Sequence, residues 1–139
     1  MNLFEWKPDY SVGNAQIDMQ HKQLFRMAGE LHEAMVNGHG KEIIESLLDK
    51  LVSYTSHHFA SEERLMKESG YPGYQQHHAD HEKLASQVLE YQAKVKTRAC
   101  AVTVEMMRFL RDWLDHHIRG ADMKVGVYLK SQLAPAGRA

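Results

Sequence analysis

Residues 58–81 read HFASEERLMKESGYPGYQQHHADH and hold two polar pairs, one on each side of a turn. His58 and Glu62 are four residues apart before the turn, and His77 and His81 are four apart after it. Side chains at this spacing lie on one face of an α-helix. The segment SGYPG between the pairs has the Gly and Pro content of a tight connection. We therefore expect two antiparallel helices whose polar pairs face a common core.

Similar turn signals divide the rest of the chain. They occur in NGHG at 37–40, more weakly over 96–99, and at Gly120. The helices that we expect span 15–36, 41–67, 74–95 and 100–119, with an irregular arm over 1–13 before them and a short amphipathic helix over 122–132 after them. Because connections this short make neighbouring helices antiparallel, the sequence predicts an all-α fold, an up-down-up-down four-helix bundle. We expect one domain over 1–133 and a disordered tail over 134–139.

Composition narrows the classes of function. The chain has 139 residues, a net charge of -1 and no long basic run, so a nucleic-acid partner is not expected. No segment approaches the roughly 18 apolar residues of a membrane span, and the first residues form no apolar leader. We therefore expect no membrane insertion and a cytoplasmic location. The expected helices carry no outer apolar stripe, so we expect a monomer.

Histidine is the unusual residue type, with ten in the chain. Polar residues interrupt the apolar helical stripes at six positions, which are His21, His58, Glu62, His77, His81 and His117. Counted from the expected turns at about 1.5 Å of rise per residue, all six lie at one level of the bundle. Burying them costs several kcal/mol unless they pair or bind a cation, so we expect a metal. The histidines off the stripes are expected at the surface: His32, His39, His57, His78 and His116.

Asp122 is the seventh candidate ligand. It lies five residues after His117, which on an ideal α-helix turns its side chain about 140° away from the core. Gly120 lets the backbone leave helical geometry and return the carboxylate to the site. A ligand set without cysteine excludes iron–sulfur clusters and thiolate zinc, and suits Fe, Mn, Cu or Zn.

Seven ligands are too many for one ion. Two six-coordinate ions that share both carboxylates and a bridging oxo or hydroxo group would use all seven and keep one position open. An open position on a dinuclear redox metal in an apolar core is suited to a small neutral diatomic molecule.

At these residues the sequence resembles the hemerythrin family, and more closely its single-domain bacterial members, over nearly the whole chain. The motifs that carry the resemblance are IDMQH at 17–21, HFASE at 58–62, HHADH at 77–81 and HIRGAD at 117–122, preceded by Trp6, Tyr10 and Gly13. The resemblance implies reversible binding of dioxygen at a non-haem di-iron centre. The corresponding role is oxygen transport, storage, or delivery to an oxygen-consuming enzyme.

The resemblance also implies how two iron ions are held. It assigns three histidines to one iron, which are His77, His81 and His117. It assigns the other two, His21 and His58, to the second iron, which carries the open position. The bridges are Glu62, Asp122 and an oxo or hydroxo group. The apolar residues that match the family's dioxygen pocket are Leu24, Phe59, Trp113, Leu114 and Ile118.

Other functions stay open on the sequence alone. A ferritin-like oxidase would carry Glu-x-x-His pairs, which this chain lacks. Peroxidase or nitric-oxide chemistry at the same centre would make the protein a redox enzyme. A sensor of oxygen or iron would act through a separate signalling partner. A histidine-rich bundle without metal would keep its stability when metal is removed.

Overall fold

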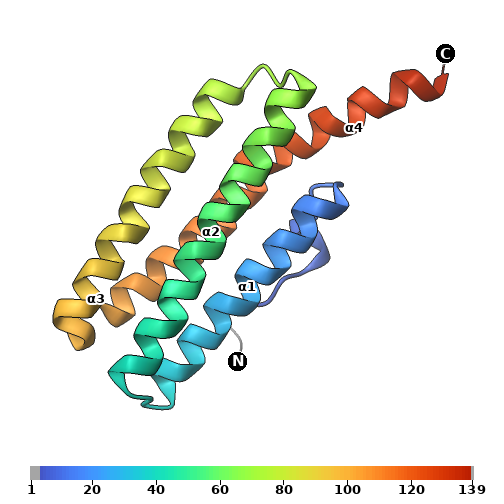
Figure 1. Ribbon diagram of the computed structural model, residues 1–139. Coiled ribbons are helices and arrows are strands. Elements are labelled where there is room, and N and C mark those ends of the chain that lie inside the picture. The colour runs from blue at the N-terminus through green and yellow to red at the C-terminus, as the bar shows by residue number, and fades with distance from the viewer. Residues whose placement is uncertain (1–3, 139) are drawn as a thin grey trace.

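The computed structural model describes residues 4–138, without the side chains of 98–103 and 133–138. Its elements in chain order are η1 Pro8–Tyr10, α1 Ala15–Val36, α2 Lys41–Ser69, α3 Tyr74–His117, η2 Ile118–Asp122 and α4 Met123–Arg138. All of these described elements are helical, which confirms the all-α prediction, and Figure 1 shows the long helices packed lengthwise against one another. Within the described part of the chain, no helix is both long and apolar enough to cross a membrane.

The element α3 is a helical hairpin, and its two arms supply the third and fourth helices of the bundle. The hydroxyl of Tyr91 donates a hydrogen bond to Oε1 of Glu105 at 3.1 Å, and the rings of Tyr91 and Phe109 are 5.2 Å apart. A straight helix would separate Tyr91 and Phe109 by about 27 Å. Figure 1 shows the chain turning back within α3, beside its label, between the yellow and orange arms. The four-helix bundle and the predicted reversal between its third and fourth helices are confirmed. Residues 96–99 include neither Gly nor Pro and belong to α3, so the reversal is not the separate loop that was expected there.

Local capping sets the ends of α1 and α2. The side chain of Asn14 accepts a hydrogen bond from the backbone N–H of Ile17 at 3.0 Å, so α1 begins directly after this cap. Gly70 has a φ of 68°, a left-handed conformation that ends α2. The expected end of this helix at residue 67 is therefore two residues early.

The second arm of α3 does not stop near Gly120. Residues Ile118–Asp122 form a π-helix, and α4 follows without a break. Gly120 does not have a positive φ, so the backbone continues through it in a right-handed helical conformation. The expected end of the helix at residue 119 is therefore wrong. The disordered tail expected over 134–139 stays a prediction, although the backbone of 134–138 belongs to α4; Ala139 lies outside the described residues.

Apolar side chains enclose the level at which the inward histidines lie. On α1, Ile17 and Leu24 come before and after His21 and are 0% and 1% exposed. On α2, Leu51 and Met66 stand on either side of the polar pair and are 1% and 0% exposed. The polar residues therefore form a layer that apolar packing separates from water above and below.

The N-terminal arm, which includes η1, is bound across the bundle. The hydroxyl of Tyr10 donates to Oδ1 of Asp115 at 2.8 Å, and the backbone N–H of Val12 donates to Oδ1 of Asp18 at 2.8 Å. The Val12 backbone lies directly on α4, because a Cβ added at Gly126 would come within 2.0 Å of the Val12 carbonyl oxygen. Only glycine at this position allows such a close approach.

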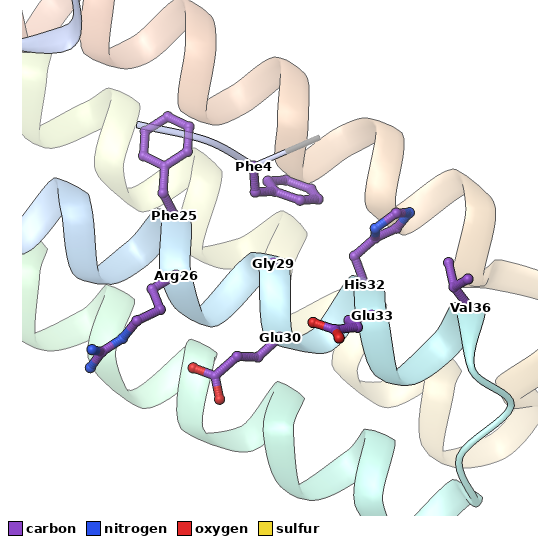
Figure 2. A pocket seen from close by; sticks show the side chains of 8 residues that line it. All are labelled: Phe4, Phe25, Arg26, Gly29, Glu30, His32, Glu33 and Val36. Atoms are coloured by element: carbon purple, nitrogen blue, oxygen red, sulfur yellow. The ribbon is translucent and has the colours of Figure 1, made fainter. Parts of the chain in front are cut away.

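A groove of about 470 Å³ lies beside the arm, along the C-terminal half of α1 (Figure 2). Phe4 and Phe25 lie along it, and it runs past His32 as far as Val36. Figure 2 shows Arg26 pointing away from Phe4. Because the groove begins beyond the inward histidine of α1 and runs toward the end of that helix, it is separate from the polar layer.

We predict that Gly126→Ala lowers the free energy of unfolding by about 1–3 kcal/mol, because the new methyl group forces Val12 away from α4. Chemical denaturation of the metal-free protein measures this change. Gly120→Ala is the control, since an added Cβ there meets nothing within 4 Å. Equal stability of the Gly126→Ala variant and the unmodified protein would contradict the close packing of the arm.

Candidate metal centre

Seven polar side chains converge inside the bundle from α1, α2, both arms of α3, and η2. Six of them are at most 3% exposed, and the seventh, His117, has a side chain that is 9% exposed. They are the seven residues expected from the sequence: His21, His58, Glu62, His77, His81, His117 and Asp122. Groups of this polarity are rarely buried together unless they are paired or bind a cation.

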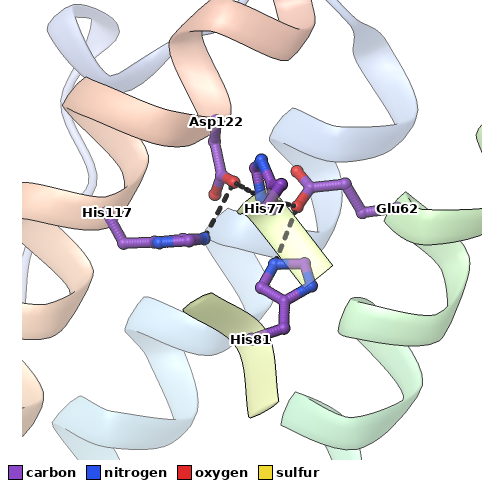
Figure 3. A group of neighbouring side chains, drawn as sticks. All are labelled: Glu62, His77, His81, His117 and Asp122. Carbon is purple, nitrogen blue, oxygen red and sulfur yellow. Dashed lines mark ion pairs between the residues drawn. The ribbon is translucent and has the colours of Figure 1, made fainter. Parts of the chain in front are cut away.

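The larger set of side chains surrounds one possible metal position. Figure 3 shows Glu62, His77, His81, His117 and Asp122 pointing toward one another, and their ligand atoms all lie within 4.8 Å. Nε2 of His77 is 2.9 Å from Oε1 of Glu62 and 3.0 Å from Oδ1 of Asp122. Nε2 of His81 is 3.1 Å from the same Glu62 oxygen, and Nε2 of His117 is 3.1 Å from the same Asp122 oxygen.

A second set surrounds a neighbouring position. It consists of His21, His58, Glu62 and Asp122, whose ligand atoms also lie within 4.8 Å of one another. Nε2 of His21 is 2.9 Å from Oδ2 of Asp122, and the rings of His21 and His58 are 4.8 Å apart. Both carboxylates belong to both sets. The arrangement therefore has two metal positions with three histidines at one, two at the other, and two carboxylates between them.

The convergent atoms have the properties of metal ligands. Nε2 of His21, His77, His81 and His117 and all four carboxylate oxygens of Glu62 and Asp122 are buried without a hydrogen-bond partner in the described part of the chain. Adjacent ligands on an octahedral ion with bonds of about 2.1 Å are about 3.0 Å apart. The nitrogen–oxygen distances of 2.9–3.1 Å agree with this spacing. The donor set thus fits two metal ions.

The electrostatics of the metal-free site also favour cations. Burial alone would raise the pKa of Asp122, but His117, His21 and His77 hold it well below its usual range. Burial lowers the pKa of His58 to about 4, which leaves that ring neutral and able to bind a metal. Burial also opposes protonation of His77, but Asp122 and Glu62 raise its pKa to about 10. Protons therefore compete with metal ions for this site, and metal binding releases them.

The π-helix η2 brings Asp122 into the site. His117 and Asp122 are five residues apart, and a π-helix turn places residues at this spacing on the same side. Asp122 is 0% exposed and contacts histidines of both metal positions. A backbone adjustment at Gly120 was expected from the sequence. The structure makes this adjustment as a wide turn within a continuous helix.

Two residues outside the predicted set contact candidate ligand rings at Nδ1, the ring nitrogen that faces away from the metal position. Nδ1 of His58 lies 2.7 Å from Oε1 of Gln20, and Nδ1 of His81 lies 2.8 Å from Oε2 of Glu63. Such contacts orient a ligand ring and direct its Nε2 toward the metal. Sequence reasoning missed both roles. The sequence indicates these roles only weakly, in that each residue is adjacent to a candidate ligand: Gln20 precedes His21, and Glu63 follows Glu62.

The remaining histidines are mostly outside the site. His39, His57 and His116 are exposed as expected, and His32 is half-buried. His78 is 38% exposed and donates from Nδ1 to Oε1 of Glu63 at 2.7 Å. His78 therefore contacts the surroundings of the centre through Glu63.

The five residues expected to line a dioxygen pocket are all buried, at 1–6% exposure. The Phe59 ring stacks on His81, with centroids 3.9 Å apart, and meets the edge of Trp113 at 5.9 Å. Trp113 therefore lies on the side of the position with three histidines, whereas Phe59 also comes within 6.0 Å of the His58 ring at the other position. Trp113 and His117 also border a surface groove of about 360 Å³. The assignment of a dioxygen pocket stays a prediction.

Comparison with known proteins places this arrangement in one family. The model of the hemerythrin HHE cation binding domain matches residues 12–129. Bacteriohemerythrin of Stenotrophomonas maltophilia is 34% identical and covers 96% of this chain and 86% of its own length. Bacteriohemerythrin of Methylococcus capsulatus is 34% identical over 94% of this chain and its full length. A crystal structure of wild-type hemerythrin is 33% identical, has a TM-score of 0.83, and covers 90% of this chain and 96% of its own.

We predict that added Fe²⁺, under anaerobic conditions, raises the thermal unfolding midpoint by roughly 10 °C, because the metal binds only the folded state. Differential scanning calorimetry with and without a chelator measures the effect. His58→Ala should reduce the shift, whereas His57→Ala, which changes the adjacent exposed ring, should retain it. A midpoint independent of metal would indicate a histidine-rich bundle that binds none.

Proposed function

The chain belongs to the hemerythrin family, and we propose that it binds dioxygen reversibly at a non-haem di-iron centre. The observation that carries this proposal is the unequal pair of metal positions, with three histidines at one and two at the other and with two shared carboxylates. A position with fewer protein ligands can accept an external one. In this proposal the protein is an oxygen carrier, store or delivery protein.

The proposed ligand assignment follows the two sets of side chains. One iron is held by His77, His81 and His117. The other is held by His21 and His58, and it carries the open position. Glu62 and Asp122 bridge the two irons, together with an oxo or hydroxo group. Two iron ions in this site would supply the two electrons that reversible dioxygen binding requires.

The choice of iron rests on the donor types and on the family. Imidazole and carboxylate ligands suit iron, although they also suit manganese, copper and zinc. Relatives with 34% identity over nearly the whole chain are named bacteriohemerythrins. The ligand set contains only two carboxylates, which favours reversible binding over the oxidation chemistry of ferritin-like centres.

The protein contributes orientation and exclusion of water. Gln20 and Glu63 hold His58 and His81 by Nδ1, which leaves Nε2 of each ring for the metal. Apolar packing around the layer keeps water from the site and disfavours the separation of charge. We propose that Leu24, Leu114 and Ile118, all at most 2% exposed, form the apolar surroundings of the bound gas. Phe59 extends these surroundings across both positions, since its ring centroid is 6.0 Å from that of His58 and 3.9 Å from that of His81, and Trp113 packs on Phe59.

Anaerobic reconstitution with Fe²⁺ tests the proposed function. We predict two irons per chain and a visible absorbance that forms in air and disappears under vacuum over repeated cycles. His117→Ala should lose iron and the reversible band, whereas His116→Ala, the adjacent exposed histidine, should keep both. Irreversible oxidation in the first cycle would instead indicate a redox enzyme or a ferroxidase.

Exclusion of water from the proposed dioxygen pocket leads to a separate prediction. Leu114→Ala or Trp113→Ala should speed the decay of the oxygenated protein to the diferric form several-fold, because water reaches the site. Stopped-flow and slow absorbance measurements give this rate. Leu48→Ala is the matched control, since Leu48 is 1% exposed and lies in α2 well before His58. Decay at the unmodified rate in Leu114→Ala and Trp113→Ala would reject the pocket assignment.

A further inference from the structure

The two metal positions have different surroundings behind their histidines. A carboxylate, Glu63, contacts His81 at the position with three histidines. A neutral amide, Gln20, contacts His58 at the position with two. Nδ1 of the other histidine at that position, His21, is buried without a hydrogen-bond partner among the described residues. At the position with three histidines, a carboxylate therefore contacts Nδ1 of a ligand ring. At the position with two histidines, no carboxylate among the described residues makes such a contact with either ring.

We propose that Glu63 and Gln20 are positioning residues that make the two metal positions electronically unequal. Glu63 makes the three-histidine position the stronger site for a ferric ion. Gln20 leaves the two-histidine position, where the proposed function places dioxygen, better suited to a ferrous ion. This inference rests on the proposed di-iron centre and adds to it the residues that set the difference between its irons.

The geometry around Glu63 fixes its carboxylate against the ligand ring. Its side chain is 18% exposed, and its two oxygens accept from Nδ1 of His81 at 2.8 Å and from Nδ1 of His78 at 2.7 Å. The ring of His78 stacks on Tyr74 at a centroid distance of 5.7 Å. Oε1 of Glu82 lies 3.3 Å from Nε2 of His78 on the solvent side. His78 thus anchors Glu63 from outside.

The geometry around Gln20 fixes its amide in one orientation. Nε2 of Gln20 donates to Oγ of Ser61 at 3.1 Å, and Gln16 donates to the same oxygen at 2.9 Å. Since the amide nitrogen is bound to Ser61, the amide oxygen must face His58, where it accepts from Nδ1 at 2.7 Å. Gln20 is 5% exposed, so this neutral contact is shielded from water.

Ligand chemistry connects this difference to redox behaviour. A charged acceptor forms a stronger hydrogen bond than a neutral one, and the effect grows in a site shielded from water. An acceptor behind a histidine raises the basicity of the nitrogen that binds the metal. A trivalent ion gains more from a more basic ligand than a divalent ion does. Glu63 should therefore stabilise the ferric state at its position more than Gln20 does at the other.

Reciprocal substitutions test the proposal in the iron-loaded protein. Glu63→Gln keeps an acceptor behind His81 without the charge, and Gln20→Glu adds a charge behind His58. Anaerobic titration with redox mediators gives the midpoint potentials of the two one-electron steps. A tenfold loss in the preference for ferric over ferrous iron corresponds to about 59 mV, so Glu63→Gln should raise a midpoint potential by about this amount. Gln20→Glu should lower one.

Glu82→Gln is the matched control, because Glu82 contacts His78 but no ligand ring and is 71% exposed. It should leave both midpoint potentials unchanged. Unchanged potentials in Glu63→Gln would overturn the proposal, and so would an equal shift in Glu82→Gln, which would indicate a general effect of surface charge. Melting of each metal-free variant verifies that it folds.

Titration with Co²⁺ separates this inference from the proposed function, since it requires neither iron nor dioxygen. Glu63→Gln should weaken one of the two Co²⁺ sites about tenfold, because a neutral acceptor behind His81 makes its Nε2 a weaker ligand than a carboxylate does. Gln20→Glu should weaken neither. Equal Co²⁺ affinity in Glu63→Gln and the unmodified protein would overturn the inference even if reversible dioxygen binding is observed. A weakened Co²⁺ site without reversible dioxygen binding would support it while rejecting the proposed function.

Discussion

The burial of two carboxylates among five imidazoles is the constraint on which this structure depends. Glu62 and Asp122 are each 0% exposed and lie between histidines from different helices. Removing two carboxylates from water costs several kcal/mol for each unless positive charge surrounds them. Every helix of the bundle must therefore place its polar residues at the same height along the bundle and rotate them toward its centre. The apolar packing above and below must therefore match the alignment of this layer.

Much of the fold could be predicted because it follows from local spacing. Steps of three and four residues place a side chain on one face of a helix regardless of its neighbours. The sequence predicted a reversal near residues 96–99 and a backbone adjustment at Gly120, but not the form of either, which is a reversal within α3 and a π-helix, η2. Residues 96–99 include neither Gly nor Pro, and Gly120 in HIRGAD permits a backbone adjustment without distinguishing a π-helix from a helix end. Contacts made across the bundle, such as that of Asp122 with His21, stabilise η2.

The candidate ligands could also be predicted, but the residues behind them could not. Gln20 is adjacent to His21 in the sequence, yet it holds His58 on another helix. Glu63 is adjacent to Glu62, yet it holds His81 on α3. Such pairs depend on the rotation of one helix relative to the next, which a single sequence does not reveal. Comparison with known proteins establishes the family.

The π-helix η2 also sets the rotational register of everything after it. A fifth residue in a turn rotates the following helix by about 100° relative to a continuous α-helix. With this rotation, Gly126 faces the backbone of Val12, and the hydroxyl of Tyr128 donates to the carbonyl of Ser69 at 2.9 Å. Deleting one residue from η2 would thus disconnect α4 from the arm and from the α2–α3 turn while removing Asp122. The position of Asp122 in the polar layer and the contacts of α4 with the arm and the α2–α3 turn therefore depend on the same rotation of the helix, so a change in that rotation alters both.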